Sequence, residues 1–169
     1  MRVEVLESLP KLEDAGRPIV DDAAVDRALR SFSAAIGTDD SLFDGETRGV
    51  AIIQGSAAAG TLCAGDFVLK LRGNLVDNRT LYFSLAEKLA SLLKEAGSAE
   101  SLAVSLSLST AGPAAEAKSA GFALMLRLQA RGNSSQQAAL RWGLGLAHVQ
   151  QALLFTSRYL RQQLSQSAD

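Results

Sequence analysis

The sequence of 169 residues is poor in the side chains that most often carry chemistry. It has one cysteine, Cys63, and one histidine, His148. A single cysteine excludes an internal disulfide and any metal site built from several cysteines. No Asp or Glu stands three or four residues from His148, so a histidine–carboxylate metal site on one helix face is also excluded. The sequence therefore predicts no metal site and no cofactor.

Long apolar runs are missing as well. No uncharged apolar stretch approaches the roughly 20 residues of a transmembrane helix. The first sixteen residues carry four acidic side chains in place of the apolar core of a signal peptide. Hydrophobic residues make up 47% and charged residues 21%, which is ordinary for soluble globular proteins. We expect a cytoplasmic protein that does not bind membranes and has a single domain over residues 1–169.

Charge is nearly balanced overall but unevenly placed. The net charge of −1 gives no general attraction to nucleic acid or to an anionic membrane. Residues 1–50 hold eleven acidic and six basic residues, whereas residues 121–169 hold five arginines and one aspartate. Either the two ends of the chain neutralise each other, within one fold or across a dimer, or the last helix presents a basic face to an acidic partner.

Hydrophobic periodicity predicts alternating strands and helices. Residues 1–21 read as a short N-terminal strand followed by a loop with two prolines. Apolar residues at helical spacing then predict a helix that stops at Gly37, and residues 38–46 read as a polar turn. Strands are predicted at 48–54, 66–72, 101–110 and 122–132, and residues 80–83 fit either a further short strand or the start of a helix.

A capping-box pattern marks the second helix. Ser84 and Glu87 are spaced as in that motif, and leucines on one face follow them. Gly97 provides a stop, so the pattern predicts a helix at 85–95 that is capped by Ser84.

The C-terminal region predicts a long helix. From Ser134 to Leu164 only Gly143 and Gly145 interrupt the helical pattern. Such a helix would span about 46 Å, which is more than a domain of this size requires. The element order is (β)αβββαββα, which predicts the α+β class with a mainly antiparallel sheet and a long C-terminal helix.

The stretch IIQGSAAAGTL, residues 52–62, is close to the phosphate-binding pattern G-x-x-x-x-G-K-[ST]. A phosphate loop needs a preceding strand, a following helix and a lysine. Strand-like residues follow Gly60, and the next lysine is Lys70, within a strand pattern. We therefore expect a hairpin connection in which glycine tolerates a positive φ.

Other candidate reactive groups lack the neighbours that they would need. A reactive cysteine requires a group that stabilises its thiolate, and nothing in the sequence brings His148 to Cys63. We expect a structural cysteine, a packed or surface histidine, and no catalytic residue. The acidic residues between Asp39 and Glu46 lack the spacing of an EF-hand loop and read as a solvated turn. Serines occupy the strand at 101–109, where nucleic-acid binding would favour basic and aromatic residues.

The N-terminal half of the long helix suggests self-association. Its apolar residues point in more directions than one packing partner covers, and two small residues four apart would admit another backbone. We predict a homodimer with a candidate interface at Leu140, Trp142, Gly143, Leu144 and Ala147. The alternative is that these side chains bury against the protein's own sheet.

The order of elements over residues 22–164 resembles the type III secretion chaperone fold. Members of that family are small, dimeric, cytoplasmic proteins that hold an extended segment of a secreted partner. The resemblance implies a non-catalytic protein-binding or assembly protein that holds a partner polypeptide on its sheet or helices. The N-terminal strand and the glycine-alanine loop are additional to that fold, and fold alone does not determine function. The competing hypothesis is a small enzyme or anion-binding protein with its site around residues 55–65; a third is a subunit of a larger particle.

Overall fold

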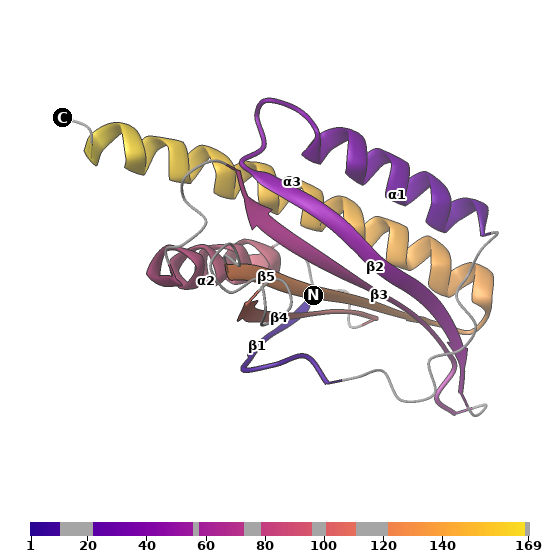
Figure 1. Cartoon of the computed structure of the whole chain (residues 1–169). Helices are drawn as coiled ribbons and strands as arrows, with labels where there is room; N and C mark the ends of the chain where they lie inside the picture. The colour runs from indigo at the N-terminus through magenta and orange to yellow at the C-terminus, as the bar shows by residue number, and fades with distance from the viewer. Residues whose placement is uncertain (11–21, 56–57, 73–78, 96–100, 111–121, 168–169) are drawn as a thin grey trace.

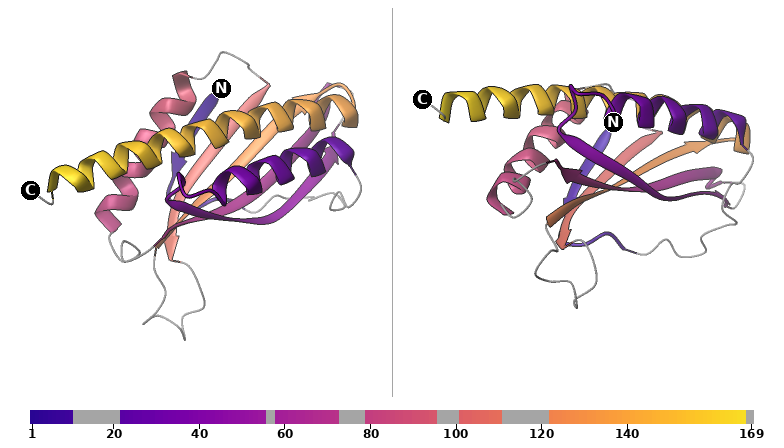
Figure 2. Two further views of the ribbon diagram at one scale, coloured as in Figure 1. Left: turned by 90° about the horizontal axis from the view of Figure 1, so that it is seen from above. Right: turned by 45° about the horizontal axis from the view of Figure 1, so that its top comes forward.

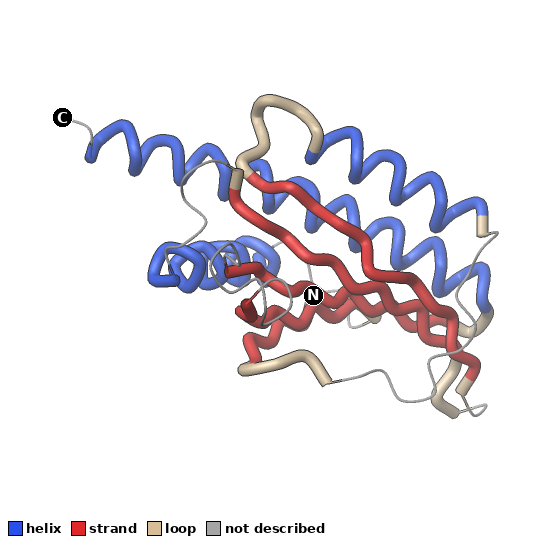
Figure 3. Tube along the Cα trace, in the orientation of Figure 1, coloured by secondary structure: helices blue, strands red, loops and turns tan. Residues whose placement is uncertain are grey.

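The computed structural model describes residues 1–10, 22–55, 58–72, 79–95, 101–110 and 122–167. The described residues form three helices and one five-stranded sheet. The helices pack on the sheet (Figures 1 and 3), which confirms the predicted α+β class and the long C-terminal helix. The elements in chain order are β1 (Arg2–Leu6), α1 (Ala23–Ile36), β2 (Phe43–Gln54), β3 (Thr61–Leu71), α2 (Arg79–Glu95), β4 (Leu102–Thr110), β5 (Phe122–Gly132) and α3 (Ser135–Ser167).

The strands form one mixed sheet in the order β1-β4-β5-β3-β2. β1 pairs with β4 in parallel, and every other neighbouring pair is antiparallel. α1 and α3 run across one face of the sheet, and α2 packs near β1 on the same side (Figure 2). One hydrophobic cluster joins buried residues of the three helices to those of β2, β3, β4 and β5. The opposite face of the sheet carries no described helix, and its polar side chains are considered below.

The second helix begins earlier than the capping box predicted. Residues 80–83 are helical, so the order is βαββαββα, one strand fewer than expected. Tyr82 is fully buried, and the Leu71 amide N–H donates to its hydroxyl at 2.9 Å. This packing extends the buried face of α2 by one turn, and Ser84 lies exposed within the helix. The assignment of Ser84 as a cap was therefore wrong.

The first hairpin is longer than predicted at both strands. β2 already begins at Phe43, which is fully buried, so part of the expected polar turn is strand. Small residues concealed this pattern. A Cβ on Gly45 would lie 3.3 Å from the ring of Phe32, and one on Gly65 would lie 2.6 Å from the ring of Trp142. These glycines make room for large rings of the helix layer and give the sequence the appearance of a loop.

α3 begins close to the predicted residue, and side chains at its N-terminus form a cap related to a capping box. The Gln137 amide N–H donates to Ser134 Oγ at 3.1 Å, and Gln137 Oε1 accepts the Asn133 amide N–H at 2.6 Å. The first contact satisfies an amide group that the first helical turn leaves unpaired, and the second fixes the residue that precedes the N-cap Ser134. The helix has 33 residues, and its C-terminal end extends past the sheet (Figure 1).

Leu89 on α2 and Leu106 on β4 are both fully buried. We expect Leu89→Ala and Leu106→Ala each to lower the free energy of unfolding by about 2–5 kcal/mol, because each substitution leaves a cavity. Urea unfolding followed by circular dichroism measures this change. Ser84→Ala, at an exposed position within α2, is the control and should change stability by less than about 0.5 kcal/mol. Losses that small at both leucines would contradict the assigned core.

Candidate functional site

The cysteine and the histidine occupy different environments. Cys63 is fully buried on β3, and burial raises the pKa of its thiol from 9.0 to about 12, with a smaller contribution from the Asp22 carboxylate. His148 is exposed on α3. Across the described residues, no group of three His, Cys, Asp or Glu side chains is placed to hold a metal ion. Cys63 is therefore a protonated core residue and has no geometry for nucleophilic catalysis.

The glycine-rich stretch forms the predicted hairpin connection. The Gly55 amide N–H donates to the Gly60 carbonyl at 2.9 Å, and Gln54 pairs with Thr61. Gly60 has a φ of 72°, and a Cβ at this position would lie 2.7 Å from the carbonyl oxygen of Gly132. Both the conformation and the close backbone therefore require glycine.

The hairpin lies beside the beginning of α3, a neighbour that the sequence did not reveal. The two segments line a cavity of about 650 Å³ whose lining residues are Gln54, Gly55, Gly60, Thr61, Asn133, Ser134 and Ser135. The helix belongs to a segment more than seventy residues away, which is why the local motif did not indicate it. All lining side chains are uncharged, and Ser134 and Gln137 already cap the helix. The cavity thus offers no cation to an anionic ligand.

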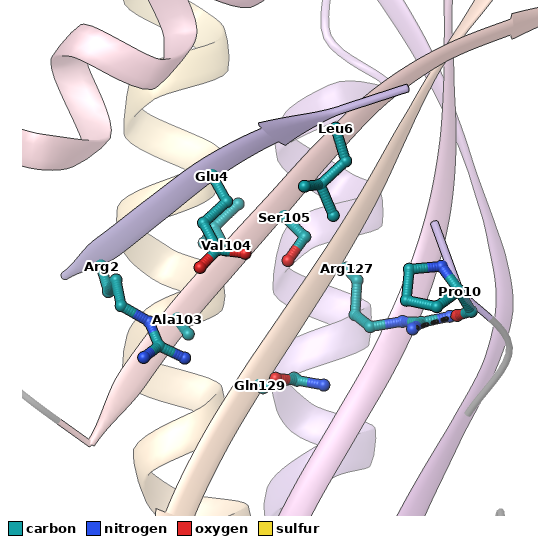
Figure 4. Close-up of a pocket in the computed structure, with 9 residues that line it drawn as sticks. All are labelled: Arg2, Glu4, Leu6, Pro10, Ala103, Val104, Ser105, Arg127 and Gln129. Carbon is teal, nitrogen blue, oxygen red and sulfur yellow. Dashed lines mark hydrogen bonds between the residues drawn. The ribbon is translucent and has the colours of Figure 1, made fainter. Parts of the chain in front are cut away.

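A buried ion pair lies on the face of the sheet opposite the helices. Arg127 on β5 donates through Nε to Asp66 Oδ1 at 2.6 Å and through Nη2 to Asp66 Oδ2 at 2.9 Å. Its third nitrogen, Nη1, donates to the Pro10 carbonyl at 2.5 Å (Figure 4). Ser107 Oγ also donates to the Glu7 carbonyl at 3.0 Å. Side chains of β4 and β5 therefore bind the backbone of residues 7–10 to this face.

A small polar cavity of about 190 Å³ adjoins this ion pair. Figure 4 shows Arg2 and Glu4 of β1, Ser105 of β4 and Gln129 of β5 around it. These side chains come from three neighbouring strands, and the parallel pairing of β1 with β4 brings them together. The sequence could not indicate this arrangement because the contributing residues are about one hundred positions apart. Each guanidinium nitrogen of Arg127 donates to Asp66 or Pro10, so among the described lining residues the one buried charge is already paired.

An apolar groove lies on the surface between α1 and α3. Leu140 and Leu144 are 51% and 65% exposed there. The groove has a volume of about 420 Å³ and is lined by Ala24, Arg27, Ala28, Ala139, Leu140, Gly143 and Leu144. Two leucines one turn apart that remain exposed beside alanines form a surface suited to apolar contact.

The five predicted interface residues separate into three environments. Trp142 is fully buried and its Nε1–H donates to the Leu128 carbonyl at 3.0 Å, so its assignment to an interface was wrong. Gly143 faces α1, because a Cβ there would lie 3.4 Å from Cβ of Ala28. Leu140, Leu144 and Ala147 are exposed and remain candidates for an interface.

Comparison with known proteins adds no relative. No protein-family model, no curated protein and no solved structure matches the chain. The resemblance to type III secretion chaperones rested on a predicted order of elements that has one strand more than the structure shows, and these comparisons do not test it. None of the helices in the described ranges is both long and apolar enough to cross a bilayer.

Cys63 should resist thiol reagents in the folded protein. Its raised pKa keeps the thiol protonated at pH 8, and burial blocks access. Reaction with Ellman's reagent should therefore require unfolding, and protein unfolded in guanidinium should react at one thiol per chain.

The free energy of unfolding should fall as the pH rises above about 9. The Cys63 thiol ionises there in the unfolded chain, whereas in the folded protein its pKa of about 12 keeps it neutral. The Cys63→Ala variant should lack this part of the pH dependence. Rapid labelling of the native protein would contradict the assignment of Cys63 as a buried, protonated thiol.

The Asp66–Arg127 pair should contribute more to stability than an exposed pair of the same type. Asp66→Asn leaves the buried Arg127 guanidinium without its counter-charge and should cost about 3 kcal/mol; the Asp66 side chain is 25% exposed, which keeps this near the lower end for buried pairs. Asp44→Asn, which breaks the more exposed contact with Arg72, should cost less than about 1 kcal/mol. Urea unfolding of both variants checks this, and equal losses would contradict it.

Proposed function

We propose that this protein is a non-catalytic binding and assembly protein that forms a homodimer through α3 and holds a partner polypeptide on its helix layer. The observation that carries the proposal is the exposed leucine pair, Leu140 and Leu144, in the groove between α1 and α3. Burial of a leucine side chain stabilises an interface by about 1.5–3 kcal/mol, so exposure of two neighbouring leucines favours an apolar partner for this surface.

The surroundings of the leucines suit close contact between helices. Ala147 is exposed one turn after Leu144, and Ala24 and Ala28 of α1 line the other side of the groove. Small side chains at these positions would let a neighbouring helix approach closely. Arg27 stands in the lining, where its aliphatic stem can be covered while its guanidinium stays in water.

A second copy of the chain is the occupant that we propose for this groove. In a two-fold interface the same patch contacts itself, and here the leucine and alanine side chains can pack on one another while the Arg27 guanidinium stays in water. The described residues bring together no nucleophile, general base or metal ligands that would favour an enzyme instead. The alternative, an anion site at the 55–65 hairpin, has a helix N-terminus nearby but only uncharged side chains in its cavity.

Light scattering coupled to size exclusion tests the dimer. At tens of micromolar we expect about twice the 17.8 kDa mass of one chain. Leu144→Glu should give a folded monomer, because dimerisation would desolvate the new carboxylate. Gln162→Glu is the matched control, since it adds the same charge to an exposed position on α3 five turns beyond the groove. A wild-type mass near 17.8 kDa would contradict the homodimer.

A further inference from the structure

The C-terminal part of α3 exposes two aromatic rings. Phe155 and Tyr159 are 53% and 36% exposed, and they lie one turn apart on the helix. This part of α3 lies where α2 crosses beside it, away from α1 and the leucine groove (Figure 2). Exposed neighbouring rings offer a large apolar area at a small cost in side-chain entropy, which is why aromatic residues recur at binding surfaces.

A cation stands over each ring. The guanidinium carbon of Arg158 lies 5.8 Å from the centroid of Phe155, and Lys88 Nζ on α2 lies 4.9 Å from the centroid of Tyr159. A cation–π contact holds a flexible cationic side chain in place without neutralising its charge. In the described parts of the chain, the ion pairs involve Arg30, Arg72, Arg127 and Arg161, and none involves Arg158 or Lys88. Two ordered positive charges are therefore available to a partner.

The helix around these rings has no negative charge of its own. α3 carries three arginines and His148 but no aspartate or glutamate from Ser135 to Ser167. Among the described arginines of α3, Arg161 alone forms an ion pair, with the Asp40 carboxylate at 3.9 Å, and it also donates to the Asp39 backbone carbonyl. A second copy of this end of α3 would bring like charges together, whereas an acidic partner would gain attraction.

We infer that Phe155, Arg158 and Tyr159 of α3, together with Lys88 of α2, form a docking surface for an acidic segment of a partner polypeptide. The carboxylates of the segment pair with Arg158 and Lys88, while its apolar side chains cover the two rings. The inference rests on the proposed binding function and adds the chemistry of the partner. It also uses a surface separate from the leucine groove, so both surfaces can be occupied together.

A polypeptide fits this surface better than a nucleic acid does. Nucleic-acid affinity comes mainly from many phosphate contacts, and this patch offers two free cations on a chain with a net charge of −1. An acidic segment needs only a few carboxylates and gains apolar contact with Phe155 and Tyr159.

Fluorescence anisotropy of labelled peptides tests this surface. The probe is a soluble peptide that repeats Glu-Leu-Glu-Phe, and its control has lysine in place of every glutamate. We expect only the acidic peptide to bind, with an affinity that falls about tenfold between about 50 and 300 mM NaCl. Arg158→Glu and Lys88→Glu should each weaken binding about tenfold or more, and Phe155→Ala should also weaken it.

The control variants carry the same changes elsewhere. Arg48→Glu reverses an exposed arginine on β2, and Phe83→Ala removes an exposed ring on the other side of α2; neither should alter binding. Circular dichroism verifies folding, and Lys88→Ala replaces Lys88→Glu if the reversal unfolds α2. Equal binding of the basic peptide, full binding by Arg158→Glu, or tighter binding of oligodeoxythymidine would overturn the inference.

The two proposals can fail independently. A dimer that does not bind the acidic peptide would retain the leucine interface and overturn the docking surface. A monomer that binds the acidic peptide would retain the docking surface and overturn the leucine interface. Leu144→Glu should remain able to bind the peptide, because Leu144 is separated from Phe155 by three turns of α3.

Discussion

The packing of Trp142, on α3, against the sheet is the contact on which the rest of the fold depends. Its ring lies over Gly65 of β3, where a side chain would clash, and stacks 6.0 Å from the ring of Phe67. Its indole N–H donates to the Leu128 carbonyl of β5, so one side chain fixes α3 to two neighbouring strands, β3 and β5. Gly145, one turn along the helix, also approaches Leu128 closely. Larger residues at Gly65 or Gly145 would lift α3 from the sheet.

The opposite face of the same two strands is held by a different interaction. Gly65 pairs with Leu128 and the next pair along is Asp66 with Arg127, so the apolar and ionic contacts are adjacent in register. Arg127 then reaches the Pro10 carbonyl and binds the chain that follows β1. A buried charge pair is weak evidence for stability on its own, but here it also fixes which segment lies on this face. The centre of the sheet therefore organises both of its sides.

The sequence predicted the elements with strong period and missed those made of small residues. The alternating leucines of β4 and the regularly spaced apolar residues of α3 were sufficient to predict these two elements, because the buried residues of each follow that spacing. Gly45 and Gly65 hid the ends of β2 and β3, since a glycine that makes room for a ring carries no hydrophobic signal. Tyr82 belonged to α2 because its hydroxyl accepts a backbone N–H of β3, a tertiary contact outside any local pattern. The ion pair and the two α3 surfaces likewise join residues distant in sequence.

α3 can present two distinct surfaces because it is longer than its own sheet can cover. Along its first half, the side towards the sheet is buried by Trp142 and Leu146, and the outer side retains Leu140 and Leu144. Farther along, Thr156 and Ser157 replace apolar residues on the buried side, and each donates to a carbonyl four residues earlier. The Leu42 amide N–H donates to Ser157 Oγ, so the helix is fixed there by hydrogen bonds. In this second half of α3, hydrogen bonds hold the inner side, and the aromatic and cationic residues Phe155, Arg158 and Tyr159 lie on the outer side. The apolar surface of the first half and the charged surface of the second half are therefore separate on one helix.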